Sequence, residues 1–169
     1  AISRRAAELA GEFQNRYEWC GAGTRSIIRA GEEAGLSLDS VHGLVADHIE
    51  VPREHEVAVE AALGERLHYV VVRSQEEGIR AIDYLKTRTA GRSSFVPLRV
   101  RASAVDRAST ESLQGTTRLL DVVRVKEEFR NIAEYLLGDT FLVPDLHSGI
   151  VLWQRNGFRG TLVTPDGDM

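Results

Sequence analysis

Apolar positions along this chain follow strand spacing and helix spacing in turn. In the first half, short runs of β-branched and aromatic residues predict three strands, at 41–50, 69–73 and 94–98. Apolar residues at helical spacing between them predict two helices, one from Pro52 to Gly64 and one that begins after Ser74. Helices that alternate with strands predict a mixed α/β (α+β) fold.

Single residues mark where these helices begin and end. Pro52 suits the first turn of its helix, because its missing N–H costs little there, and Gly64 can end that helix. Ser74 is the predicted N-cap of the next helix, with Glu77 at the capping-box position. Apolar residues at helical spacing follow, at Ile79, Ile82 and Leu85. Gly91 then breaks the pattern.

The second half of the chain repeats this order of elements. Its predicted elements are a helix over 126–137, a strand over 140–143, a helix from Asp145 to about 156 and a strand over 160–164. Asp47 and Asp121 each stand four residues before a valine and seventeen residues before the glycine of a Leu-Gly pair, Gly64 or Gly138. We interpret the repeat as an internal duplication, which predicts two similar lobes.

The segments outside the two copies have their own patterns. Apolar residues at heptad spacing predict a helix over 1–20, and a second helix over 25–34 follows, which Gly35 can end. Small polar residues over 99–117 predict a linker. The expected organisation is a helical segment at 1–35, lobe I at 36–98, the linker at 99–117 and lobe II at 118–169. Because the chain begins inside a helical pattern without methionine and ends just after a strand, we expect a fragment.

Composition limits the classes of function. Hydrophobic residues make up 43% and charged residues 27% of the chain, which is typical of a globular protein. No apolar run approaches the ~20 residues of a membrane-spanning helix. The single cysteine, Cys20, cannot form an internal disulfide and favours a reducing compartment. A net charge of -4 means that any affinity for nucleic acid has to be local.

The sequence offers three weak candidates for chemistry. The Gly-Ala-Gly run at 21–23 lacks the lysine and the preceding strand of a phosphate-binding loop. His48 and His55 with a nearby carboxylate could hold zinc, although Pro52 between them favours two surface histidines. Cys20 with a remote histidine could form a nucleophilic pair, but a lone buried thiol in a helix is more common. None of these patterns predicts an enzyme.

Charge is polarised along the first copy. Residues 47–65 hold six acids and one arginine, whereas residues 80–101 hold six basic residues and one aspartate. The basic stretch is either a solvated face or a patch that contacts DNA phosphates without reading sequence. Tyr84 and Phe95 are the only aromatic residues among these arginines, so a base-stacking platform is poorly supported.

Long, ordered motifs then point to a family. The run from Gly43 to Leu98, beginning GLVADHIEVPREHEVAVEAALGERLHYVVV, closely resembles the hinge domain of the SMC chromosome-maintenance ATPases, most of all the prokaryotic members. In the second half, YLLGDTFLVPDLHSGIVL and TLVTPDGDM match the family's Leu-Leu-Gly, apolar strand, Asp-Leu, helix and Thr-x-Asp-Gly-Asp pattern. The resemblance covers about 36–169, and the helix before it then looks like the end of a coiled-coil arm.

The resemblance implies the SMC hinge fold and a dimerisation module without catalytic activity. Lobe I of one chain would bind lobe II of a second hinge, giving a homodimer in a prokaryotic protein. Hinges of this family also bind DNA through basic residues near the arm junction, a role carried here to Lys86, Arg88 and Arg92. ATP and magnesium would bind the separate ATPase heads, leaving this fragment without cofactor or metal. The implied role is chromosome condensation and segregation, in the cytoplasm at the nucleoid, with no membrane partner.

One departure and two alternatives accompany this interpretation. Family members continue beyond the Asp-Gly-Asp strand with a glycine-rich segment that helps to build the dimer contact, whereas this chain stops at Met169. We therefore expect the fragment to dimerise weakly, to pair abnormally or to be monomeric. The first alternative is a duplicated α/β regulatory domain that binds a small molecule in a cleft between its lobes. The second is a small hydrolase that uses Cys20 or the histidines.

Overall fold

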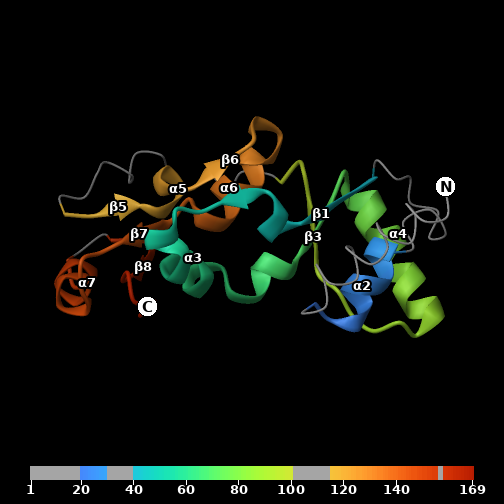
Figure 1. Cartoon of the computed structure of the whole chain (residues 1–169), viewed down its shortest axis with the longest axis horizontal. Coiled ribbons are helices and arrows are strands. Elements are labelled where there is room, and N and C mark those ends of the chain that lie inside the picture. Colours follow the sequence, from blue (N-terminus) through green and yellow to red (C-terminus); the bar gives the residue numbers. More distant parts are fainter. Residues whose placement is uncertain (1–19, 30–39, 101–114, 156–157) are drawn as a thin grey trace, which may run out of the picture.

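The computed structural model describes residues 20–29, 40–100, 115–155 and 158–169 of the chain. The helix predicted over 1–20, the end of the helix predicted over 25–34 and most of the predicted linker therefore lie outside the described residues. Two small sheets lie toward opposite ends of an elongated molecule, with short helices and a two-stranded ribbon between them (Figure 1).

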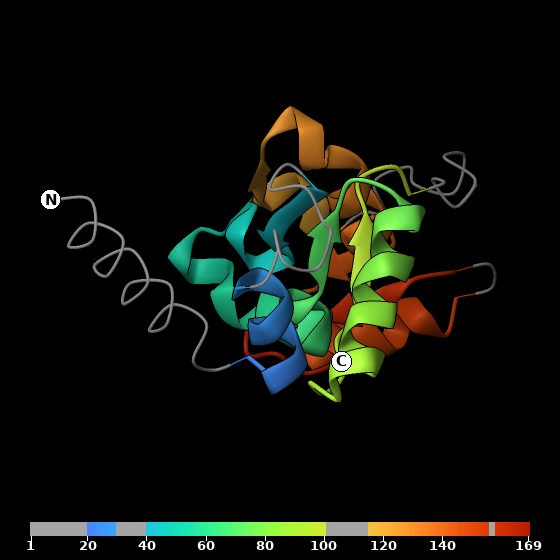
Figure 2. The ribbon, with the colours of Figure 1, turned by 90° about the vertical axis from the view of Figure 1, so that its right-hand side faces the viewer.

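The first sheet has the strand order β1-β3-β4. β1 (Val41–Leu44) is antiparallel to β3 (Val70–Val72), and β4 (Phe95–Pro97) is parallel to it. α4 (Gln75–Arg88) connects β3 to β4, and α2 (Ala22–Arg29) lies beside α4 (Figure 2). Side chains from these helices and from the sheet form one buried cluster, which includes Ile27, Leu44, Val70, Val72, Ala81 and Leu85. We call the elements from β1 to β4 lobe I.

The second sheet repeats this topology in the order β5-β7-β8. β5 (Thr117–Arg118) is antiparallel to β7 (Thr140–Leu142), and β8 (Thr161–Val163) is parallel to it. α7 (Leu146–Trp153) is the connecting helix that corresponds to α4. We call the elements from β5 to β8 lobe II. The prediction of a mixed α/β fold built from a duplicated unit is confirmed.

Each lobe inserts the same short elements between its first two sheet strands. In lobe I these are the 3-10 turn η2 (Val45–Asp47), β2 (Ile49–Glu50), the turn η3 (Arg53–His55) and α3 (Glu56–Leu63). In lobe II they are α5 (Leu119–Val122), β6 (Arg124–Val125), the turn η6 (Glu127–Phe129) and α6 (Arg130–Leu137). α3 and α6 begin 74 residues apart and end 74 residues apart, so the two copies are in register. After α3, lobe I adds a further turn, η4 (Gly64–His68).

The two copies meet at a short antiparallel ribbon between β2 and β6. Ile49 pairs with Val125, and Glu50 pairs with Arg124. Glu50 and Arg124 are themselves 74 residues apart, so they are equivalent positions of the duplication. Equivalent residues that face each other in an antiparallel pair lie on a twofold axis, and a pseudo-twofold axis of the molecule therefore passes through this pair.

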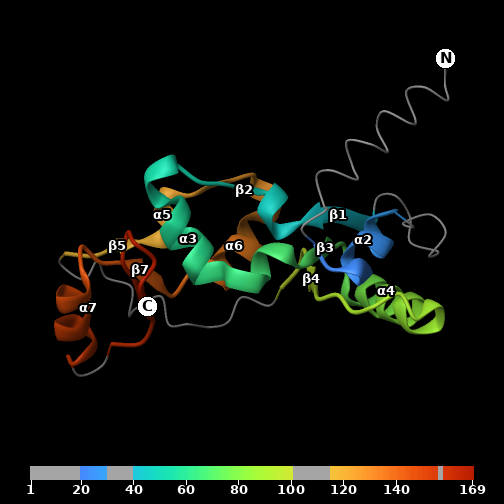
Figure 3. The same ribbon diagram turned by 60° about the horizontal axis from the view of Figure 1, so that its bottom comes forward.

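One apolar core serves both lobes. α3 and α6 lie side by side between the sheets (Figure 3), and α3 of lobe I also contacts β8 of lobe II. Gly167, just after β8, lies against Val57 and Ala61 of α3. The buried members of this core come from both copies: Val59, Leu63, Val71 and Val96 from lobe I, and Leu119, Ile132, Leu136, Leu137 and Val163 from lobe II. Because neither lobe has this core to itself, we expect the lobes to unfold together.

Replacing Leu137 by alanine tests this shared core. Leu137 is fully buried on α6, and a leucine-to-alanine change at such a site lowers the free energy of unfolding by about 3–5 kcal/mol. Urea unfolding followed by circular dichroism should show one transition at lower denaturant for Leu137→Ala. Val151→Ala on α7 is the control, since Val151 is 43% exposed and should cost less than about 1 kcal/mol. Two separate transitions would contradict a common core.

The continuous strand predicted over 41–50 is wrong. The chain leaves β1 at Leu44, makes the turn η2 and resumes as β2 at Ile49. Gly43 has a positive φ of 84°, and a carboxylate oxygen of Asp47 accepts a hydrogen bond from the backbone N–H of Leu44 at 2.9 Å. Aspartate side chains that bind nearby backbone favour turns over strands. The break lets β2 leave the first sheet and pair with β6.

Other predicted elements agree closely with the structure, with two informative differences. The Ser74 hydroxyl caps α4 by accepting from the N–H of Glu77, but the Glu77 carboxylate pairs with Arg80 at 3.5 Å and does not complete a capping box. α2 begins at Ala22, three residues before the predicted start at residue 25, so Gly23 lies inside the helix. A side chain at this position would clash with the backbone carbonyl of Arg92, so the glycine allows α2 to approach that loop.

Candidate functional site

The three basic residues predicted to contact DNA lie at one end of lobe I. Lys86 and Arg88 are in the last turn of α4, and Arg92 follows in the loop before β4. α4 ends at Thr89, which has a left-handed φ of 51°, and the chain turns again at Gly91 with a φ of 98°. These turns bring the loop back past the helix end. The guanidinium carbon of Arg88 lies 5.4 Å from the centre of the Tyr84 ring, which is a cation–π contact.

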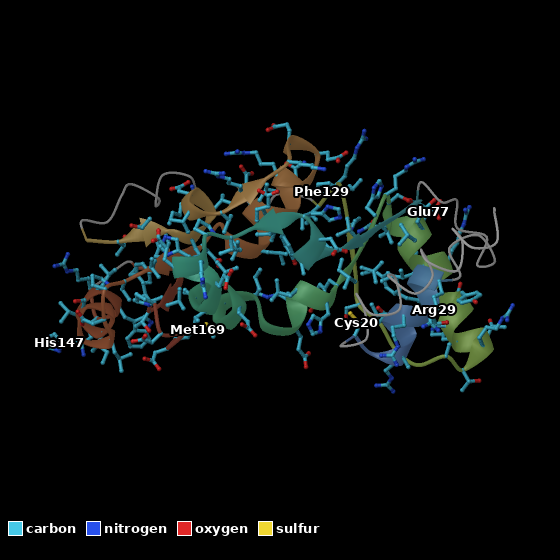
Figure 4. All side chains as sticks on the ribbon, in the orientation of Figure 1. Cys20, Arg29, Glu77, Phe129, His147 and Met169 are labelled. Carbon is cyan, nitrogen blue, oxygen red and sulfur yellow. The ribbon has the colours of Figure 1, made fainter. Side chains whose placement is uncertain are left out.

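α2 carries a further exposed cation. Arg29 is exposed in the last turn of α2, and α2 packs beside α4 (Figure 4). Within the described residues, the side chains of Arg29, Lys86 and Arg92 make no ion pair or hydrogen bond, so each can bind an anion. Sequence reasoning assigned no role to Arg29, and it is the other end of α2, at Gly23 and Thr24, that meets the loop of Arg92. We call Lys86, Arg88 and Arg92 the basic surface.

The loop that carries Arg92 is fixed to α2 by a close glycine contact. A Cβ atom at Gly91 would lie 3.0 Å from the backbone nitrogen of Gly23, and the hydroxyl groups of Thr24 and Ser93 are hydrogen-bonded at 2.8 Å. Thr24 is buried, so this bond is shielded from water. The contact therefore fixes the loop that carries Arg92 against the start of α2.

The two lobes also expose equivalent apolar faces. Gly78 of α4 is buried beside Val72 of β3, and Gly149 of α7 is buried beside Val143, which directly follows β7. Each glycine is followed by an exposed isoleucine. On α4 the exposed side chains are Ile79 at 59% and Ile82 at 39% exposure; on α7 they are Ile150 at 47% and Trp153 at 69%. The sequence placed Ile79 and Ile82 at helical spacing with Leu85, but Leu85 is buried and both isoleucines face solvent. Sequence periodicity shows which residues share a side of a helix and cannot show what covers it.

An apolar cavity accompanies the exposed face of lobe II. It has a volume of about 400 Å³ and lies between α7 and the end of the chain after β8. Its walls include Leu146, Ile150, Trp153 and Met169, all of which are substantially exposed. Contiguous apolar surface of this kind is typical of a protein–protein contact.

The zinc and nucleophile alternatives find no support in the geometry. Among the described residues, no group of three histidine, cysteine or acidic side chains could hold a metal ion. The Nε2 atom of His55 lies 3.4 Å from a carboxylate oxygen of Glu54, whereas the ring of His48 stacks on Phe129. Cys20 is buried, and this burial raises the pKa of its thiol, with Asp47 adding to the effect and Arg25 opposing it. A thiol with a raised pKa is a poor nucleophile at neutral pH.

His48 instead joins the lobes near the pseudo-twofold axis. Its ring stacks on Phe129 of lobe II, with ring centres 3.6 Å apart and an angle of 14° between planes, and its Nε2 hydrogen-bonds the carbonyl oxygen of His42. His42 meets the same phenyl ring edge-on at 6.1 Å. Figure 4 marks Phe129 between the two sheets. Burial lowers the pKa of His48, although the His42 carbonyl and Asp47 partly oppose this effect.

The lowered pKa of His48 predicts a loss of stability in acid. The unfolded chain takes up a proton at the ordinary histidine pKa of about 6.5, whereas folded His48 resists it, so the free energy of unfolding falls as pH drops below that value. Urea unfolding at pH 8 and pH 5.5 should show this difference. His48→Gln should reduce the pH dependence, because glutamine does not titrate there. An unchanged pH dependence in the variant would exclude His48 as its source.

Comparison with known proteins agrees with this geometry. The family described as "SMC proteins Flexible Hinge Domain" matches residues 38–153, which is more than half of the chain. The "Chromosome partition protein Smc" of Myxococcus xanthus is 34% identical over 161 residues, and that of Methanocaldococcus jannaschii is 33% identical over 139. These alignments cover 94% and 82% of this chain but only 13% and 12% of the relatives, so the chain spans about an eighth of their length.

Two solved structures have the same fold and similar sequences. A crystal structure of an asymmetric dimer of the Geobacillus stearothermophilus SMC hinge domain matches with a TM-score of 0.75 and 28% identity, covering 99% of this chain and 71% of that one. The hinge domain of the Pyrococcus furiosus SMC protein matches with a TM-score of 0.65 and 28% identity, covering 92% and 78%. The hinge is a non-catalytic domain, and no ATPase head is among these 169 residues. None of the described helices is long and apolar enough to cross a membrane. This chain belongs to the family of SMC flexible hinge domains.

Proposed function

We propose that this chain is the dimerisation module of a chromosome-partition SMC protein and that lobe I of one copy binds lobe II of another. The observation that carries the proposal is the pair of equivalent apolar faces, one on α4 and one on α7. Because each copy has one face of each kind, two copies can make two identical contacts and close into a ring. Relatives named for chromosome partition, and a solved hinge described as a dimer, support the role in chromosome condensation and segregation.

Open sheet edges lie beside both apolar faces. β4 ends the strand order of lobe I, and β8 ends that of lobe II, so the outer edge of each has no strand partner among the described residues. An unpaired edge offers backbone N–H and C=O groups to another chain. We infer that these edges contribute to the contact together with the helices.

Sedimentation velocity tests the dimer directly. The chain, and a longer version that continues beyond Met169, should both sediment faster as concentration rises through the micromolar range. The longer version should associate more tightly if the glycine-rich segment expected after Met169 adds to the contact. A longer version that stays strictly monomeric at high micromolar concentration would refute the proposed dimerisation.

A second candidate function is contact with DNA phosphates through the basic surface. The specific observation is that Lys86 and Arg92, which lie close together along the chain at the end of α4, have no ion-pair or hydrogen-bond partner within the described residues. Such contacts need no sequence readout, which suits a protein that acts along a whole chromosome in the cytoplasm at the nucleoid. ATP and magnesium would then act at the heads of the parent protein, outside these residues.

A further inference from the structure

A cleft of about 760 Å³ opens where lobe I faces α6 of lobe II. It lies at the carboxyl ends of the parallel strands β3 and β4, the position where open α/β sheets commonly bind ligands. The side chains that give it chemical character are two arginines, one glutamate and three aromatic residues: Arg73, Arg99, Glu76, Tyr69, Phe95 and Tyr135. This cleft is distinct from the basic surface, which lies at the other end of α4.

The charged groups in the cleft are available for binding. Arg73 directly follows β3 and Arg99 follows β4, and both are exposed. Among the described residues, neither guanidinium makes an ion pair or hydrogen bond. Glu76 is the one acidic residue that lines the cleft, and hydrogen bonds from its own backbone N–H and the Ser74 hydroxyl lower its pKa. The lining therefore carries two cations and one ionised carboxylate.

Aromatic rings supply the apolar part of the cleft. Tyr135 of α6 is 52% exposed, so its ring is open to solvent at the cleft. Tyr69 and Phe95 are half-buried beside it in lobe I. Flat rings next to guanidinium groups suit a ligand with a planar ring and an anionic group.

The duplication provides an internal comparison for this set of residues. The strand registers pair Val70 with Phe95 in lobe I and Thr140 with Thr161 in lobe II, which aligns the two sheets. By that alignment, Arg73 corresponds to Val143, Phe95 to Thr161 and Arg99 to Pro165; α3 and α6 align Tyr135 with Ala61. The equivalent position of the duplication thus has none of these cationic or aromatic groups, and the cavity of lobe II is apolar. Side chains needed only for the fold of the repeat would be expected in both copies.

We propose that this cleft binds a nucleoside phosphate. Arg73 and Arg99 bind the phosphate through charge-assisted hydrogen bonds, and Tyr135 with Phe95 stacks on the base. The Glu76 carboxylate accepts hydrogen bonds from the ribose hydroxyls, a role that acidic residues take in nucleotide sites. The ligand is either a free nucleotide or a nucleotide unit of an unpaired strand, because both present the same groups. The proposal does not require that the hinge dimerises.

Isothermal titration of the full chain with ADP tests the proposal. Saturable binding is expected, and Arg73→Gln and Arg99→Gln should each weaken it about tenfold or more, since each removes a charged hydrogen bond. Tyr135→Leu should weaken it through loss of stacking. Arg80→Gln is the matched control, because Arg80 lies on α4, is exposed, pairs with Glu77 and does not line the cleft. Equal affinity of all variants, or no binding of ADP, would overturn the proposal.

Two further titrations identify which part of the ligand is bound. If Glu76 contacts the 2′-hydroxyl, the wild type should bind 2′-deoxyADP more weakly than ADP. The Glu76→Gln variant should bind the two nucleotides with equal affinity. Inorganic phosphate should bind far more weakly than ADP, because it lacks the base. Oligothymidylate distinguishes the two sources of ligand. If it competes with ADP, the site also accepts nucleotide units of an unpaired strand; if ADP binds and the oligomer does not compete, the ligand is a free nucleotide. Binding of the oligomer without any binding of ADP would show a strand surface in place of a nucleotide site.

Discussion

Replacing Ile150 and Trp153 of α7 by glutamate should convert the hinge dimer into monomers. These two side chains are 47% and 69% exposed and form the apolar face of lobe II. A buried aromatic anchor contributes about 2 kcal/mol or more to a protein–protein contact, and each added carboxylate would be buried without a partner. We expect dimer dissociation constants to rise at least about a hundredfold, measured by sedimentation velocity.

Matched variants make this test specific. Val151→Glu lies on the same helix but lines a different cavity, so it should leave the dimer intact. Glutamate at Ile79 and Ile82 of α4 should disrupt the dimer as the α7 changes do, because lobe I carries the other half of each contact. Circular dichroism melting confirms that every variant is folded.

A mixing experiment decides between the proposed contact and its alternatives. In the proposed ring, a chain altered only on α4 and a chain altered only on α7 are each monomeric alone. When they are mixed, the intact α7 face of the first can bind the intact α4 face of the second, so one contact is restored. Recovery of a heterodimer supports contact between unlike lobes. If lobe I bound lobe I instead, the chain altered only on α7 would remain a dimer by itself.

Replacing Lys86, Arg88 and Arg92 together by glutamine should weaken DNA binding on the order of a hundredfold at about 0.1 M salt. Each cation that neutralises a phosphate releases counterions, so the logarithm of affinity falls with the logarithm of salt concentration by about 0.9 per contact. Fluorescence anisotropy across a salt series should show that slope fall by about three in the triple variant. Duplex and single-stranded probes should both respond, since phosphates rather than bases are bound.

The control for this experiment changes the net charge by the same amount but on a different surface of the molecule. Lys126, Arg155 and Arg159 are exposed cations of lobe II, and their triple replacement by glutamine removes the same charge from another surface. If the basic surface is the DNA site, this control should retain most of the affinity and the salt slope. If the two triple variants lost DNA affinity equally, the loss would come from the overall net charge and not from the basic surface.

Much of the fold could be predicted because local signals and tertiary structure agree. The β-branched run at β3, the serine cap of α4 and the glycine at the end of α3 each act within a few residues of chain. The elements β5, α5 and β6 could not be predicted, because each is only two to four residues long. β5 and β6 are also defined only by their pairing with strands distant in sequence. A strand of two residues leaves no periodicity to detect.

The candidate sites depended even more on tertiary packing. A family resemblance and a local run of positive charge were enough to indicate Lys86, Arg88 and Arg92 from the sequence. Their role in DNA binding stays a prediction. The cleft at Arg73 and Arg99 could not be found from sequence, since those residues come together only when β3 and β4 pair and α6 of the other lobe faces them. The exposure of Ile79 and Ile82 on α4 could not be predicted either, because it depends on which side of that helix is covered by α2 and the sheet.

The Glu50–Arg124 pair on the pseudo-twofold axis has a consequence for the origin of the hinge. Equivalent residues that face each other across an axis are the mark of an isologous dimer, in which one surface binds a second copy of itself. Here both copies belong to one polypeptide, and α3 of the first is packed against the second. The hinge monomer thus has the organisation of a half-length homodimer whose subunits were joined by gene fusion. Once joined, the two halves could diverge, one toward arginines and aromatic rings and the other toward an apolar surface.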